Sequence, residues 1–190
     1  TPISTDAIVY IIFPDNAKEK YYRIGDNEDD NQVFGPEQAR AGISIAKNTD
    51  LYAWYKNDIG ATSIVGKVSI SNIDKVGPDI NISTTDQDIT GNIDKESSAS
   101  SIDVKVKDDA DGLGLSRAYY VLNNSEQKNI SIDPDTGEAN IHLDERGHYL
   151  FVAIDKAGNT EIFNFELLSK PKITTTPKLS SGDKFNDDVT

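Results

Sequence analysis

The chain of 190 residues has no cysteine, no methionine and a single tryptophan. Without cysteine it has no disulfide bond, no thiolate nucleophile, no iron–sulfur cluster and no cysteine-ligated zinc site. Basic residues are also scarce, since 19 lysines and arginines stand against 32 aspartates and glutamates, a formal net charge of −13. Nucleic acids and anionic membrane surfaces bind mainly through lysine and arginine, so this charge predicts neither as a partner.

Long apolar runs are missing as well. The longest run, residues 7–13, is far shorter than the ~18 apolar residues that a membrane-spanning helix needs, so we expect no membrane insertion. No initiator methionine precedes Thr1-Pro2-Ile3, and we therefore expect a fragment of a longer precursor, from which targeting signals could have been removed.

What the sequence does contain is a strand pattern, with apolar residues at alternate positions in short segments bounded by turn residues. In residues 101–107, Ile102, Val104 and Val106 alternate with polar and charged residues, which predicts one buried and one solvated face. The only helix we expect is short, over residues 36–41. Further strands are expected at residues 8–13, 21–24, 43–45, 51–55, 64–73, 79–82, 118–122, 139–143, 149–154 and 162–167.

The turns between these segments place glycine late, where a positive φ is expected, as in residues 133–137, 144–147 and 155–159. Strands that recur every ~8–12 residues with such turns are typical of a β-sandwich or barrel.

An internal repeat divides the chain. Residues 51–61 align with residues 149–159 with their glycines in register, and an aromatic pair, Tyr21-Tyr22 or Tyr119-Tyr120, precedes each copy. The seam lies at residues 71–80, where Gly77-Pro78 ends one strand before the next begins. We therefore predict one domain over residues 1–76 and a second over residues 77–169. Residues 170–190, rich in Thr, Ser and Pro, are interpreted as a linker or the start of a further module.

Three segments resemble those of bacterial immunoglobulin-like repeats, which occur in tandem in secreted and surface-anchored proteins, chiefly of Gram-positive bacteria. They are Asp155-Lys156-Ala157-Gly158-Asn159 after an aromatic strand, the seam at residues 72–78, and Asp111-Gly112-Leu113-Gly114. The resemblance is closer over residues 78–168 than over residues 7–73, where Asn57-Asp58-Ile59-Gly60-Ala61 departs from the turn sequence.

The resemblance implies an all-β fold of two tandem immunoglobulin-like β-sandwich domains, a monomer at the cell surface or cell wall or secreted. It implies a non-catalytic spacer or adhesin module, which holds a functional head away from the envelope or binds a host protein or glycan. The alternative is a carbohydrate-binding accessory module of a secreted polysaccharide-active enzyme. Nothing in the sequence names a ligand, and edge-strand pairing with a peptide stays open.

The sequence contains few of the motifs that catalysis requires. The chain has no Gly-x-Ser-x-Gly nucleophile motif, and Gly112-Leu113-Gly114 is too short for a dinucleotide loop. Its two histidines, His142 and His148, lie in or beside one predicted strand, with His142 pointing outward. We predict that the chain is not an enzyme and assign no catalytic, cofactor-binding or metal-binding residue.

Calcium is the one cofactor left open, because a hard cation takes carboxylate and carbonyl oxygens from loops. Residues 26–37 have acids at several positions of a helix–loop–helix calcium loop, but Asn31 replaces its glycine, which favours an acidic hairpin tip. The second place is the seam, where sandwich topology brings loops together. The acids there are Asp74, Asp79, Asp108, Asp109, Asp111 and Asp155. The competing interpretation is that these aspartates only form solvated turns.

Aromatic residues gather in the first half of the chain. Exposed rings can stack on the apolar faces of sugars, which would suit a carbohydrate-binding surface. Trp54, however, falls in the central apolar strand of the repeat, where a sandwich buries a tryptophan, and we therefore predict it in the core. The remaining members of the group are Tyr21, Tyr22, Tyr52 and Tyr55.

Overall fold

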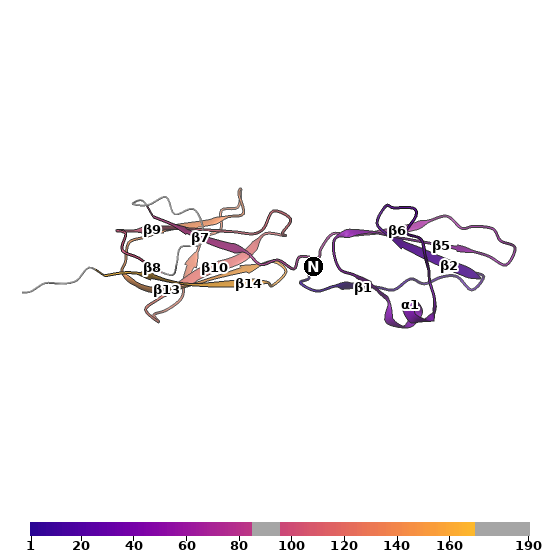
Figure 1. The fold of residues 1–190 in the computed structure, drawn as a ribbon, viewed down its shortest axis with the longest axis horizontal. Coiled ribbons are helices and arrows are strands. Elements are labelled where there is room, and N and C mark those ends of the chain that lie inside the picture. Colours follow the sequence, from indigo (N-terminus) through magenta and orange to yellow (C-terminus); the bar gives the residue numbers. More distant parts are fainter. Residues whose placement is uncertain (85–95, 170–190) are drawn as a thin grey trace, which may run out of the picture.

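The computed structural model describes residues 1–84 and 96–169. Over these residues the chain is all-β, with four sheets and one short helix, as the alternating pattern predicts. The strands fall into two units, which Figure 1 shows end to end along the long axis. Residues 170–190, interpreted above as a linker or further module, lie outside the described residues. No helix among the described residues is long and apolar enough to cross a membrane.

The first unit, residues 1–73, has a four-stranded sheet in the order β3-β2-β5-β6 and a two-stranded sheet, β1-β4. Its core includes Phe34, Ile43, Ile45, Leu51 and Ile70, which come from both sheets and from the connection between β3 and α1. The elements are β1 (Ala7–Val9), β2 (Glu19–Ile24), β3 (Gln32–Val33), α1 (Pro36–Ala41), β4 (Ile43–Ile45), β5 (Thr49–Lys56) and β6 (Gly66–Ile70).

The second unit, residues 79–169, packs a sheet of order β12-β9-β7 against a sheet of order β11-β10-β13-β14-β8. Its core is a separate cluster in which Ile102, Tyr149, Phe151 and Phe165 have no exposed surface. The elements are β7 (Asp79–Ser83), β8 (Glu96–Ser97), β9 (Ile102–Lys107), β10 (Leu115–Leu122), β11 (Lys128–Ile130), β12 (Ala139–Leu143), β13 (Gly147–Asp155) and β14 (Thr160–Leu167).

The two units repeat the same strand register. Tyr21 pairs with Trp54 in the first unit, as Tyr119 pairs with Val152 in the second. In the smaller sheets, Ala7 pairs with Ile45 as Ile102 pairs with Leu143. Pairs can therefore be compared position by position between the units.

The prediction that Trp54 lies in the core is wrong. Leu51 on the same strand is buried, so the alternation of side chains along β5 turns Trp54 to the opposite, outward face of the sheet. There its ring lies nearly parallel to that of Tyr21, with 5.8 Å between centroids. Trp54 is half-buried, because the strand register, and not the apolar composition of the strand, decides which face of the sheet its side chain occupies.

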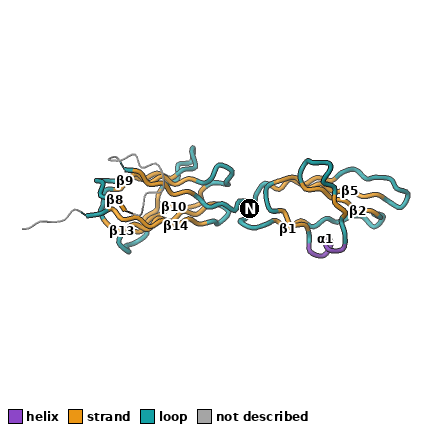
Figure 2. The backbone as a smooth tube through the Cα atoms, in the orientation of Figure 1, coloured by secondary structure: helices purple, strands orange, loops and turns teal. Residues whose placement is uncertain are grey.

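The seam connects the units through residues 74–78, and loops at the near end of the second unit lie beside it (Figure 2). Ile3 forms a parallel bridge with Ile73 and accepts a hydrogen bond from the Asp74 amide, 2.9 Å. The first residues of the chain therefore fix the backbone on which Asp74 sits. Further contacts of Asp74 reach into the second unit.

Candidate metal centre at the junction

Asp74 is the seam residue that faces the second unit, and its side chain is buried. Its Oδ2 accepts a hydrogen bond from the Leu113 amide, 3.0 Å, so the loop after β9 is attached to the seam. Its Oδ1 is 3.3 Å from the Val76 amide, which donates to it. The carboxylate is thus held by backbone groups of both the seam and the second unit.

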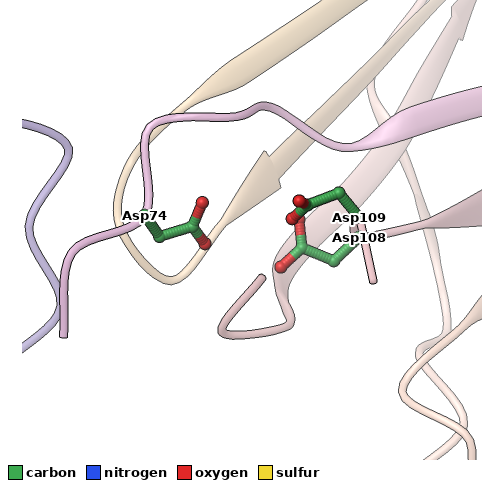
Figure 3. A group of neighbouring side chains, drawn as sticks. All are labelled: Asp74, Asp108 and Asp109. Carbon is green, nitrogen blue, oxygen red and sulfur yellow. The ribbon is translucent and has the colours of Figure 1, made fainter. Parts of the chain in front are cut away.

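Two further carboxylates come from the loop that follows β9. The Gly114 amide donates to Asp108 Oδ2 at 2.6 Å, and the Gly112 amide donates to the Asp109 carbonyl at 3.2 Å. These bonds curl the loop so that both side chains turn toward Asp74, as Figure 3 shows. One carboxylate oxygen from each of Asp74, Asp108 and Asp109 lies within 4.8 Å of the other two.

Asp108 Oδ1 and Asp109 Oδ1 are buried and have no hydrogen-bond partner. None of the ion pairs between described residues involves Asp74, Asp108 or Asp109. A buried carboxylate oxygen without a partner is costly, because it has lost water and gained nothing in return. A positive charge would stabilise these two oxygens and the third carboxylate beside them.

The electrostatics of Asp108 agree with this geometry. Burial raises the pKa of its carboxyl, and the charges of Asp74 and Asp155 raise it further, against the lowering effect of hydrogen bonds from the backbone of Gly114 and Asp109. Removal from water and like charges both disfavour the ionised form. A cation bound beside Asp108 would favour the ionised carboxylate and so lower its pKa.

Gly112 gives the two carboxylates the room they occupy. A methyl group at this position would come within 2.3 Å of Asp108 Oδ2 and of Asp109 Oδ1, far inside van der Waals contact. Any larger residue therefore has to displace the carboxylates. The glycine belongs to Asp111-Gly112-Leu113-Gly114, which the sequence marked as a loop but not as part of a site.

An open cleft of about 500 Å³ leads to the cluster. Seam residues, the turn between β4 and β5, and the β9–β10 loop line it, so it lies between the units. Lys47 and Lys75 also line it, but Lys75 pairs with Asp6 of the first unit. Water and small ions can enter from this side.

The turn between β13 and β14 fastens the second unit to the seam. Asp155 Oδ1 accepts hydrogen bonds from the Gly158 and Asn159 amides at 2.6 and 2.9 Å, which closes the turn, and Gly158 has a φ of +94°. The Asn159 side-chain Nδ2 donates to the carbonyl oxygens of Asp74 and Val76 at 2.9 and 3.2 Å. The Asp-Lys-Ala-Gly-Asn sequence is therefore a clamp on the seam.

The equivalent turn of the first unit has the same backbone but no clamp. Asn57 Oδ1 accepts hydrogen bonds from the Ile59 and Ala61 amides, and Gly60 has a φ of +78°. Ala61 occupies the position of Asn159, so this turn has no side-chain amide to donate to a preceding segment. The differences between the two turn sequences thus include the residue that makes the contact.

Only three of the six aspartates named from the sequence come together in the structure. Asp74, Asp108 and Asp109 form the cluster, while Asp111 is exposed and only lines the cleft. Asp155 is buried in its own turn, and Asp79 is exposed at the start of β7. The role of Asn159 was missed, although its place at the end of a repeated turn sequence was a visible signal.

The other acidic segment, residues 26–37, forms the connection from β2 to β3 and the start of α1. The Asn27 side chain accepts from the Asp29 amide at 3.2 Å and donates to Asp30 Oδ2 at 3.0 Å, which closes a hairpin tip. A strand, and no helix, precedes it. The hairpin interpretation is the one that the structure supports.

The donor set suits a hard divalent cation. The three carboxylates each bring one oxygen to a common place, and water from the cleft would supply further ligands. Ca²⁺ takes six to eight oxygen ligands at variable angles, whereas Mg²⁺ needs a near-regular octahedron. The described cluster contains no histidine, the nitrogen ligand typical of zinc sites. Loop carboxylates with an open cleft for water favour calcium.

Comparison with known proteins gives no match to a family model and no match to a curated sequence.

Proposed function

We propose that the chain is a non-catalytic extracellular spacer built from two tandem immunoglobulin-like β-sandwich domains, residues 1–76 and 77–169. The strand order of the second unit supports this, because β12-β9-β7 facing β11-β10-β13-β14 matches the two sheets of an immunoglobulin-like sandwich. The Tyr149 hydroxyl donates to the Glu145 carbonyl at the corner before β13, the contact known as a tyrosine corner. The first unit repeats the register of these strands.

The spacer holds its two domains in a fixed relation through a calcium ion at Asp74, Asp108 and Asp109. The observation that carries this part is the pair of buried, unpartnered oxygens, Asp108 Oδ1 and Asp109 Oδ1, beside the carboxylate of the seam. A cation there joins a ligand of the connecting segment to two ligands of the second domain, and so resists bending. The excess of surface acids keeps neighbouring chains apart and soluble.

Calorimetric titration of the whole chain with Ca²⁺ tests the metal site. We expect one site with a dissociation constant of roughly 0.1 to 1 mM, the range of extracellular calcium modules. Asp108→Asn removes one ligand charge, and Gly112→Ala displaces two carboxylates, so both are expected to weaken binding at least tenfold. Asp30→Asn, in the exposed hairpin, is the matched control and is expected to bind as the parent does.

Absence of binding heat up to 10 times that range, or equal binding by the parent and Asp108→Asn, would contradict the calcium site. The spacer proposal would survive the first result, because sandwich topology and the Asn159 clamp do not need an ion. Mg²⁺ in place of Ca²⁺ is the selectivity control, and we expect much weaker binding.

A second candidate function is that of a carbohydrate-binding accessory module, and one observation favours it. Trp54 and Tyr21 stack on the outward face of the first sheet, next to Tyr52, where rings can meet a sugar. A glycan array separates the two functions. A carbohydrate module binds a glycan family and loses it on Trp54→Ala, whereas a spacer gives no glycan signal with either protein.

A further inference from the structure

Asn48, in the turn between β4 and β5, bonds to the chain one residue before Asp74. Its side-chain Nδ2 donates to the Ile73 carbonyl oxygen at 3.0 Å, and its Oδ1 accepts from the Ile73 amide at 2.8 Å. A carboxamide can do this because it has a donor and an acceptor side by side, as the peptide group does. One side chain of the first unit thus holds both backbone groups of Ile73.

The other side of this backbone is bonded to the first residues of the chain. Ile3 donates to the Asn72 carbonyl oxygen and accepts from the Asp74 amide, both at 2.9 Å. The Ile73 side chain is 6% exposed and belongs to the core of the first unit. The first unit therefore fixes the entrance to the seam from both sides.

The second unit holds the far side of Asp74 with another asparagine. Asn159 Nδ2 donates to the carbonyl oxygens of Asp74 and Val76, and the Leu113 amide donates to Asp74 Oδ2. Asp74 is thus the residue at which a clamp from one unit meets a clamp from the other. The direction of its carboxylate depends on both.

The second unit has the equivalent of the Asn48 contact in a simpler form. By the shared strand register Arg146 is the equivalent of Asn48, and its Nη1 donates to the Leu168 carbonyl oxygen at 2.7 Å, just after β14. A guanidinium has donors only, so it cannot also accept from a backbone amide. This position holds the exit of each unit, and at the seam it carries the side chain that fixes both backbone groups.

We propose that Asn48 is a positioning residue for the calcium site, which holds the backbone at Ile73 so that the Asp74 carboxylate faces the other two ligands. Through this contact the orientation of the first unit is coupled to binding of the ion. The coupling is reciprocal, so calcium also tightens the contact between Asn48 and Ile73. The inference rests on the proposed calcium site for its effect on affinity, whereas the placement of Asp74 needs no ion.

A matched control stands at the opposite end of β5. Asn57 Oδ1 accepts from the Ile59 and Ala61 amides in the turn after this strand. Asn57→Ala therefore removes two hydrogen bonds between an asparagine and the backbone of the first unit, as Asn48→Ala does. It leaves the seam intact, so it separates a loss of first-unit stability from a loss of positioning.

The test follows hydrogen exchange of the Leu113 amide, which reports from the second unit on the Asp74 carboxylate, in the full chain with chelator. We expect about fivefold faster exchange in Asn48→Ala and the parent rate in Asn57→Ala. Asn48→Ser, whose hydroxyl can keep one of the two bonds, should give an intermediate rate. Circular dichroism checks that each variant is folded.

Calorimetric titration of the same proteins with Ca²⁺ measures the coupling. Asn48→Ala should bind about fivefold more weakly than the parent, and Asn57→Ala as the parent does. In the parent, Ca²⁺ should also slow exchange of the Ile73 amide, and in Asp108→Asn it should not.

Unchanged Leu113 exchange in Asn48→Ala, or equal acceleration in both alanine variants, would overturn the proposal, because Asn48 would then only stabilise the first unit. Weaker calcium binding by Asp108→Asn but not by Asn48→Ala would overturn the coupling and leave the metal site standing. No calcium binding by the parent would overturn the site and the coupling together, while faster Leu113 exchange in Asn48→Ala alone would still support the placement of Asp74.

Discussion

Replacing Asp108 with asparagine is expected to change the thermal stability of the second unit in opposite directions with and without calcium. Without calcium, the change removes a desolvated negative charge that faces Asp74 and Asp109, while the amide oxygen can still accept from the Gly114 amide. We expect a gain of about 1 kcal/mol, which corresponds to a rise of ~4–8 °C in the melting temperature of a domain of this size.

With calcium the order of the two proteins should reverse. A ligand at 100 times its dissociation constant stabilises the folded state by about 2.7 kcal/mol, and the parent chain should gain this amount. The asparagine variant binds the ion poorly and gains little. Differential scanning calorimetry in chelator and in excess Ca²⁺ measures all four melting temperatures, with Asp30→Asn as the control. A variant less stable than the parent in both conditions would mean that Asp108 serves only to shape its loop.

The second large effect is expected from Phe151→Ala in β13. Phe151 has no exposed surface and stacks on Tyr149, with 5.4 Å between ring centroids. Loss of a buried phenylalanine costs about 3–5 kcal/mol, a large part of the roughly 5–15 kcal/mol that stabilises a typical domain. The melting temperature of the second unit should therefore fall by roughly 12 °C or more.

The first unit should keep its structure in this variant, because the two core clusters share no residue. Just above the lowered melting temperature of the second unit, backbone amide signals of β2 and β5 in an NMR spectrum should stay dispersed while those of β10, β13 and β14 collapse. Ile162→Ala is the control in the same sheet, and we expect a change within about 0.5 kcal/mol because that side chain is largely exposed. Collapse of both sets of signals would show one cooperative fold and contradict two independent domains.

Local patterns in the sequence account for most of the strands. Alternation predicted β9 and β12 with their buried faces, and the late glycines of three turns, Gly137, Gly147 and Gly158, do have positive φ. β1 is shorter than the apolar run 8–13 because β4, its paired strand, spans only Ile43–Ile45. The length of a strand depends on its partner, which the run itself does not reveal.

Long-range geometry was harder to predict. The expected sandwich topology places the β9–β10 loop beside the seam, which led us to group Asp74, Asp108 and Asp109. The same reasoning included Asp79, which is exposed at the start of β7. Trp54 was misplaced because composition favoured burial while register, counted from Leu51, decided the face. The Asn159 contacts span 85 and 83 residues and follow from the docking of one turn on the seam.

The most direct test of the calcium-stiffened junction is the distribution of distances between spin labels on the two units. The chain has no cysteine, so single cysteines at Glu37 and Asn140, both exposed, give specific labelling sites. We expect one narrow distance peak in Ca²⁺ that broadens in chelator, and a broad distribution in both conditions for the same protein carrying Asp108→Asn. An identical distribution with and without calcium in the parent chain would contradict a junction held by the ion.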